Sequence, residues 1–138
     1  MTQFQAPVAL TGRTLLALMF IIAGFTKIGA YAGTQQYMEA FGVPGALLPL
    51  VIILELVGGL MIAAGFFTRI TALALGGFTL LAAVLFHANF GDQIQMIMFM
   101  KNLSIAGGFL LLAVFGPGSL SVDARWKGGA VSGSGAHA

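Results

Sequence analysis

Residues 46–67 read ALLPLVIILELVGGLMIAAGFF, with Glu55 as the one ionisable side chain among them. A stretch of this length can cross a hydrocarbon core of roughly 30 Å as an α-helix that rises about 1.5 Å per residue. Similar apolar stretches cover residues 7–27, 70–87 and 94–115. None alternates with period two, and all are too long for the strands of a membrane β-barrel. We therefore predict an all-α integral membrane four-helix bundle.

The composition supports a membrane location. Of the 138 residues, 59% are hydrophobic and 7% are charged, whereas soluble domains carry about 25% charged residues. The lipid bilayer is therefore the expected environment. The net charge of +2 comes from six scattered Lys and Arg residues, so it does not indicate a nucleic-acid partner. The first residues lack the pattern of a cleaved signal peptide, and we expect the first stretch to remain as a span.

Smaller sequence features organise the chain around these spans. Residues 1–127 are expected to form one transmembrane domain, and the Gly- and Ser-rich residues 128–138 a disordered tail. Between spans one and two, residues 34–41 place Tyr37 and Phe41 at helical spacing before Gly42. This pattern predicts a short interfacial helix. Thr68 and Arg69 are expected to connect spans two and three.

The distribution of basic residues predicts the orientation in the membrane. With four spans, the two termini and the connection between spans two and three share one side. That side has four basic residues: Arg13, Arg69, Arg125 and Lys127. On the other side, the charges of Lys27 and Lys101 are balanced by Glu39 and Asp92. The positive-inside rule then places both termini in the cytoplasm.

A few polar residues within the spans are candidates for a functional site. A charge near a helix centre costs roughly 2.5 to 3.5 kcal/mol on insertion scales, so it needs a partner or a role. Glu55 is the deepest, and Gly58 and Gly59 on its helix face would let a neighbouring helix approach closely. Helical rise places Lys101 and Asn102 within a turn or two of Glu55 in height.

His87 and Lys27 end spans three and one on the outer side, above these groups. The set predicts a polar pocket that opens outward, with Glu55 and His87 as proton-exchanging groups. Structural explanations remain open. Glu55 could form only a buried ion pair with Lys101 or Arg13. His87 could bond a loop carbonyl or water, and Lys27 and Arg13 could extend to the headgroups.

Cofactors that need particular ligands are not expected. The sequence has no cysteine, which excludes an iron–sulfur cluster built from this chain alone. His87 is the one histidine outside the tail, so a haem with two histidine ligands is not expected either. No zinc or other metal-binding spacing is present, and no metal site is predicted.

The order and spacing of these residues resemble the DoxX family of small bacterial four-helix membrane proteins. The likeness covers residues 8–125. It rests on Arg13, GFTK at 24–27, FGVP at 41–44, ELVGG at 55–59, GFFTR at 65–69, His87, Lys101-Asn102, and the segment from Gly116-Pro117-Gly118-Ser119 to Asp123. Members are linked to quinone-coupled oxidation of sulfur compounds and to resistance to oxidative or thiol stress. The resemblance therefore implies an inner-membrane subunit of an oxidoreductase system.

The resulting hypothesis is a subunit that binds quinone or a similar small molecule. Glu55 and His87 would be catalytic, whereas Lys101, Asn102, Arg13 and Lys27 would bind the substrate. Because the chain has no cysteine, any sulfur chemistry would take place on a partner or a bound substrate. Two other functions remain open: a non-catalytic membrane anchor for partner proteins in a redox complex, and a small-solute or proton transporter that would need a homo-oligomer.

Overall fold

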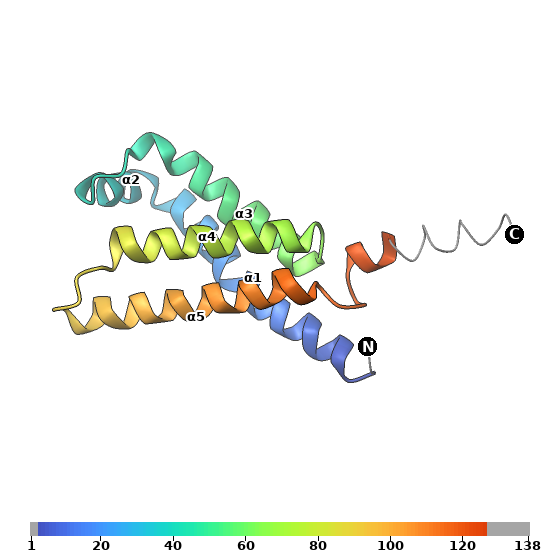
Figure 1. Cartoon of the computed structure of the whole chain (residues 1–138). Helices are drawn as coiled ribbons and strands as arrows, with labels where there is room; N and C mark the ends of the chain where they lie inside the picture. The colour runs from blue at the N-terminus through green and yellow to red at the C-terminus, as the bar shows by residue number, and fades with distance from the viewer. Residues whose placement is uncertain (1–2, 127–138) are drawn as a thin grey trace, which may run out of the picture.

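The computed structural model describes residues 3–126, and these residues contain helices but no strands. Four long helices and one shorter one follow each other along the chain (Figure 1): α1 (Gln5–Gly29), α2 (Tyr31–Ala40), α3 (Leu48–Ala64), α4 (Thr68–Phe86) and α5 (Gln93–Phe115). A 3-10 turn, η1 (Gly45–Leu47), precedes α3, and residues 122–126 are helical. The predicted all-α four-helix bundle is confirmed.

Four helical segments can cross a membrane by length and composition, namely α1, η1 together with α3, α4 and α5. Their outer faces expose Leu, Ile, Val and Phe side chains all round the bundle. Such a surface is unfavourable in water but matches acyl chains, and helices satisfy their own backbone hydrogen bonds in lipid. The chain is therefore an integral membrane protein with four candidate spans.

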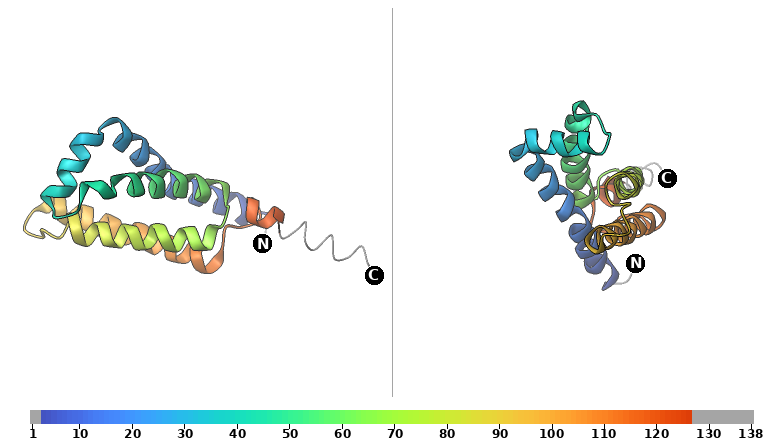
Figure 2. Two further views of the ribbon diagram at one scale, coloured as in Figure 1. Left: turned by 90° about the horizontal axis from the view of Figure 1, so that it is seen from above. Right: turned by 90° about the vertical axis from the view of Figure 1, so that its left-hand side faces the viewer.

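The four spans form two antiparallel pairs. Helix α1 packs along α3, and α4 packs along α5, while contacts between the pairs are fewer (Figures 1 and 2). The pairs meet in a buried core where the rings of Phe20 and Phe109 lie edge to face, with centroids 5.4 Å apart. Leu75, Ile62 and Ala17 complete the centre of this core.

The structure corrects the predicted connection between the second and third spans. Thr68 and Arg69 lie inside α4, and the connection is formed by residues 65–67. Gly65 ends α3 with a positive φ of 72°, which glycine adopts without steric cost. The carboxylate of Asp123 then accepts hydrogen bonds from the backbone N–H groups of Phe67 and Thr68, at 2.8 and 2.9 Å. This cap starts α4 two residues earlier than predicted.

The predicted short helix between spans one and two is α2, which starts at Tyr31 rather than at residue 34. It ends before Gly42, whose φ is 79°. The ring of Tyr37 stacks on Phe86 at the end of α4, with centroids 5.5 Å apart, and Phe41 contacts both rings. This cluster attaches α2 to the end of the bundle away from the N-terminus. The predicted disorder of residues 128–138 lies outside the described residues.

Candidate functional site

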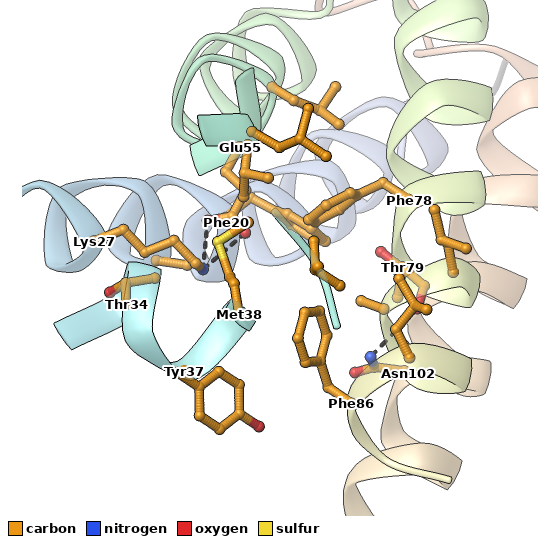
Figure 3. Close-up of a pocket in the computed structure, with 18 of the residues that line it drawn as sticks. Phe20, Lys27, Thr34, Tyr37, Met38, Glu55, Phe78, Thr79, Phe86 and Asn102 are labelled. Atoms are coloured by element: carbon orange, nitrogen blue, oxygen red, sulfur yellow. Dashed lines mark hydrogen bonds and ion pairs between the residues drawn. The ribbon is translucent and has the colours of Figure 1, made fainter. Parts of the chain in front are cut away.

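A pocket of about 590 Å³ lies between the two helix pairs. Its walls come from α1 and α3 on one side and from α4 and α5 on the other, and α2 lies at one end (Figure 3). Most of its lining is apolar, including the rings of Phe20, Phe78 and Phe86. Polar side chains are few: Lys27, Thr34, Tyr37, Glu55, Thr79, His87, Lys101 and Asn102. Five of the six predicted site residues therefore line one pocket.

Glu55 and Lys27 form an ion pair in the wall of this pocket. The Lys27 Nζ atom lies 2.8 Å from Oε1 and 2.9 Å from Oε2 of Glu55. Glu55 is 4% exposed, whereas the side chain of Lys27 retains 28% exposure. The structure therefore corrects two interpretations. The partner of Glu55 is neither Lys101 nor Arg13, and Lys27 turns inward to the carboxylate.

The glycines after Glu55 let a neighbouring helix approach closely, as the sequence predicted, and they do so on two sides of α3. A Cβ atom on Gly59 would lie 2.8 Å from Cγ1 of Ile21, so α1 crosses α3 at a separation that only glycine permits. Gly58 faces Leu75 of α4 in the same way, at 3.3 Å from its Cδ2 atom. Glu55, on the same face of α3, is consequently buried inside the bundle and away from the lipid.

Asn102 lies on the opposite wall of the pocket (Figure 3). Its amide nitrogen donates to the backbone oxygen of Thr79 at 3.3 Å, which fixes the side chain between α4 and α5. That oxygen of Thr79 is a helical carbonyl with a second lone pair available. The Asn102 side chain retains an amide oxygen and a second N–H for a ligand. The pocket thus has hydrogen-bonding groups on two facing walls.

His87 and Lys101 occupy the rim of the pocket. Nδ1 of His87, the residue that ends α4, lies 2.7 Å from the amide oxygen of Gln95. An amide oxygen can only accept, so Nδ1 of His87 is the donor of this hydrogen bond. The hydrogen-bond partner of His87 is therefore a side chain and not the loop carbonyl or water considered from the sequence. Lys101 is exposed, and its Nζ atom lies 3.3 Å from the sulfur of Met98.

The structure does not place Arg13 in the predicted substrate-binding set. Its guanidinium donates to the carbonyl oxygens of Pro117 at 2.6 Å, Leu120 at 2.9 Å and Ala63 at 3.1 Å. These partners lie in the last turn of α3 and in the segment after α5, and none of them lines the pocket. A buried arginine can satisfy several carbonyl groups at once with its planar set of donors. Arg13 therefore has a structural role.

Sequence reasoning missed the contribution of α2. Thr34, Tyr37 and Met38 line the pocket beside Lys27 (Figure 3). The sequence pattern identified Tyr37 only as part of a helix, because the sequence of a surface helix does not show which of its faces turns toward the bundle. Within residues 3–126, no three His, Asp or Glu side chains gather closely enough to hold a metal ion.

These features define a class: small membrane proteins of four spans in which a largely apolar pocket encloses an ion pair between two helix hairpins. The DoxX family profile matches residues 8–88, more than half of the chain. The chain therefore belongs to the DoxX family.

Relatives agree with this assignment. The chain is 62% identical to the Escherichia coli (strain K12) inner membrane protein YqjF over 114 residues, covering 83% of this chain and 88% of that protein. It is 43% identical to the E. coli inner membrane protein YphA over 123 residues, 84% and 88% of the two chains. A Bacillus subtilis (strain 168) protein named "Putative oxidoreductase CatD" is 29% identical over 111 residues, 75% and 82% of the two chains. No solved structure matches the chain.

Proposed function

We propose that this protein is a membrane subunit of an oxidoreductase system and that its pocket binds a quinone. The observation that carries the proposal is the pair of facing polar walls, Lys27–Glu55 and Asn102, across an apolar space of about 590 Å³. The oxidoreductase name of the B. subtilis relative supports the same class of activity.

The hydrogen-bond donors on the two facing walls suit a flat ring that carries an oxygen at each of two opposite edges. The Lys27 ammonium has three N–H groups and gives two to Glu55, so one can reach a ligand oxygen. Asn102 offers its second amide N–H from the other wall. Between these groups, Phe20, Phe78 and Phe86 provide apolar and aromatic surface against which a ring can pack.

A quinone supplies reversible uptake of two electrons and two protons at its oxygens. This chain supplies the proton-handling groups: Glu55 can hold a proton at its carboxylate beside the ligand, and Nε2 of His87 can exchange protons with water at the rim. Since the sequence has no cysteine, the electrons would pass to or from a redox centre of a partner subunit.

We further propose that the protein lies in the bacterial inner membrane with both termini in the cytoplasm. The bias of Arg13, Arg69 and Arg125 toward one end of the bundle supports this orientation, and the E. coli relatives are inner membrane proteins. The pocket and α2 would then face outward. Because the chain has no cysteine, Glu39→Cys should react with an impermeant maleimide in whole cells. Arg125→Cys should react only after lysis; the reverse pattern would refute the orientation.

The quinone proposal is tested by binding to purified protein in lipid nanodiscs. Wild-type protein should bind a ubiquinone or menaquinone analogue, and Lys27→Met and Glu55→Gln should each weaken binding at least tenfold. Glu39→Gln is the matched control, since Glu39 does not line the pocket, and it should bind as wild type does. If wild-type protein binds no analogue yet retains partner proteins in stoichiometric amounts, the quinone function is wrong and a membrane anchor is favoured.

A further inference from the structure

Residues of both α3 and α4 line the pocket. These helices touch where Gly58 of α3 meets Leu75 of α4. Beyond that contact, towards the end of the bundle that carries α2, α3 diverges from α4 (Figure 1). The pocket lining begins about one helical turn past the contact, with Leu54 and Glu55 on α3 and Phe78 on α4. The two helices therefore form the sides of a slot.

Both sides of this slot carry leucines that line the pocket and are also exposed. Leu47 lies just before α3 and Leu50 lies within it, whereas Leu81 and Leu85 lie on α4. Their exposed fractions lie between 39% and 64%. Side chains exposed on the membrane-spanning part of a helix face acyl chains. The same four leucines thus belong both to the pocket lining and to the exposed apolar surface of the bundle.

The position of the ion pair limits what can occupy this space. Glu55 is seven residues into α3, which corresponds to about 10 Å below the start of that helix. A phospholipid headgroup at that depth would lose its water and its place at the interface, which is costly for charged groups. A small uncharged head with hydrogen-bonding oxygens can reach Lys27 at much lower cost.

From these observations we infer that the slot between α3 and α4 is a lateral portal for a ligand with a long apolar chain. The uncharged head lies between Lys27–Glu55 and Asn102, and a prenyl or alkyl chain leaves through the slot along Leu50 and Leu81 into the bilayer. This inference rests on the proposed quinone function and narrows the ligand to membrane-dissolved, long-chain quinones.

The first test compares the affinity of a quinone that has an apolar tail with that of one that has none. In nanodiscs, decylubiquinone should bind at least tenfold more tightly than the tailless 2,3-dimethoxy-5-methyl-1,4-benzoquinone, after correction for partition into the lipid. Leu81→Asn, which places a polar amide on the slot, should reduce that ratio towards one. Leu111→Asn is the matched control because Leu111 is equally exposed on α5 but does not line the pocket. Equal corrected affinities for the two quinones in wild-type protein would overturn the portal.

Closing the slot gives the second test. The cysteine-free sequence allows Leu50→Cys and Leu81→Cys to be joined by bifunctional thiol reagents of graded length. The bridged protein should bind decylubiquinone at least ten times more slowly than either single variant that carries a monofunctional reagent, because one adduct narrows the slot from one side without closing it. An unchanged association rate in the bridged protein would refute lateral access.

The two proposals can fail separately. If neither quinone binds the wild-type protein, the quinone function is wrong. In that case, photolabelling with an alkyl diazirine dissolved in the bilayer tests the portal. The reagent should label Leu54 or Phe78 in protein without the crosslink and should not label them in the bridged protein. Equal labelling of these pocket residues in both would show that no lateral path exists.

Discussion

The ion pair between Lys27 and Glu55 predicts an unequal effect of removing each partner. In Lys27→Met, the Glu55 carboxylate stays at 4% exposure and loses both of its hydrogen bonds. Breaking a buried pair in this way typically costs about 3–5 kcal/mol. Since the side chain of Lys27 retains 28% exposure, the pair is partly solvated, and we expect a loss near the lower limit, about 3 kcal/mol.

Removing the charge of Glu55 should lower the free energy of unfolding by less. In Glu55→Gln, the Lys27 side chain is long and flexible enough to turn its ammonium towards the nearby membrane surface. The glutamine is also nearly isosteric and can accept one hydrogen bond, so the expected loss is about 1–2 kcal/mol. The double variant Lys27→Met with Glu55→Gln removes both charges and should fall within about 1–2 kcal/mol of wild type, which makes it more stable than Lys27→Met alone.

Reversible unfolding in mixed detergent and SDS micelles, or steric trapping in bicelles, measures these free energies as a double-mutant cycle. The four proteins should retain the same helical circular dichroism before unfolding. A double variant as unstable as the sum of the two single variants would refute the reasoning, because it would show that the two charges do not stabilise each other. An equal loss from both single variants would refute the argued asymmetry.

Three further predictions concern the packing of the bundle and use the same unfolding assay. Arg13→Met should lower the free energy of unfolding by about 3 kcal/mol, since three carbonyl groups lose the charged donor that a buried arginine supplies; a loss below about 1 kcal/mol would contradict this role. Gly59→Ala should cost about 1–3 kcal/mol through the contact with Ile21, whereas Gly77→Ala, with open space around it, should be neutral or stabilising by up to about 1 kcal/mol. Asp123→Ala should cost about 1–2 kcal/mol because α4 loses its N-terminal cap, and hydrogen exchange should increase first at Phe67 and Thr68.

Hydropathy was sufficient to predict the four spans and the all-α fold, because the length of an apolar run and the absence of period-two alternation determine both. The connection between the second and third spans was displaced, since its position depends on Asp123, more than 50 residues away. Local sequence contains no trace of such a distant cap. Gly65 was the local signal of a helix end, and the apolar residues after it obscured that signal.

The sequence predicted which residues belong to the candidate site better than it predicted which of them form the ion pair. Helical rise gave the heights of Glu55, Lys101 and Asn102, and the pocket contains all three. Rise along a helix does not give rotation about it, however, so the choice of Lys27 over Lys101 as the partner of Glu55 required the α1–α3 crossing. Arg13 was misplaced for a different reason: its partners are backbone carbonyls, which every residue possesses and no sequence pattern distinguishes.

The attachment of Arg13 has a consequence for biogenesis. Its guanidinium enters the membrane with the first span, yet its bond to Pro117 links residues 104 positions apart in the chain. At a synthesis rate of about 5–20 residues per second, that partner emerges about 5–20 s later. Throughout this interval the guanidinium lacks its partners Pro117 and Leu120, so water, lipid phosphates or the insertion machinery must take their place until the segment after α5 has been made.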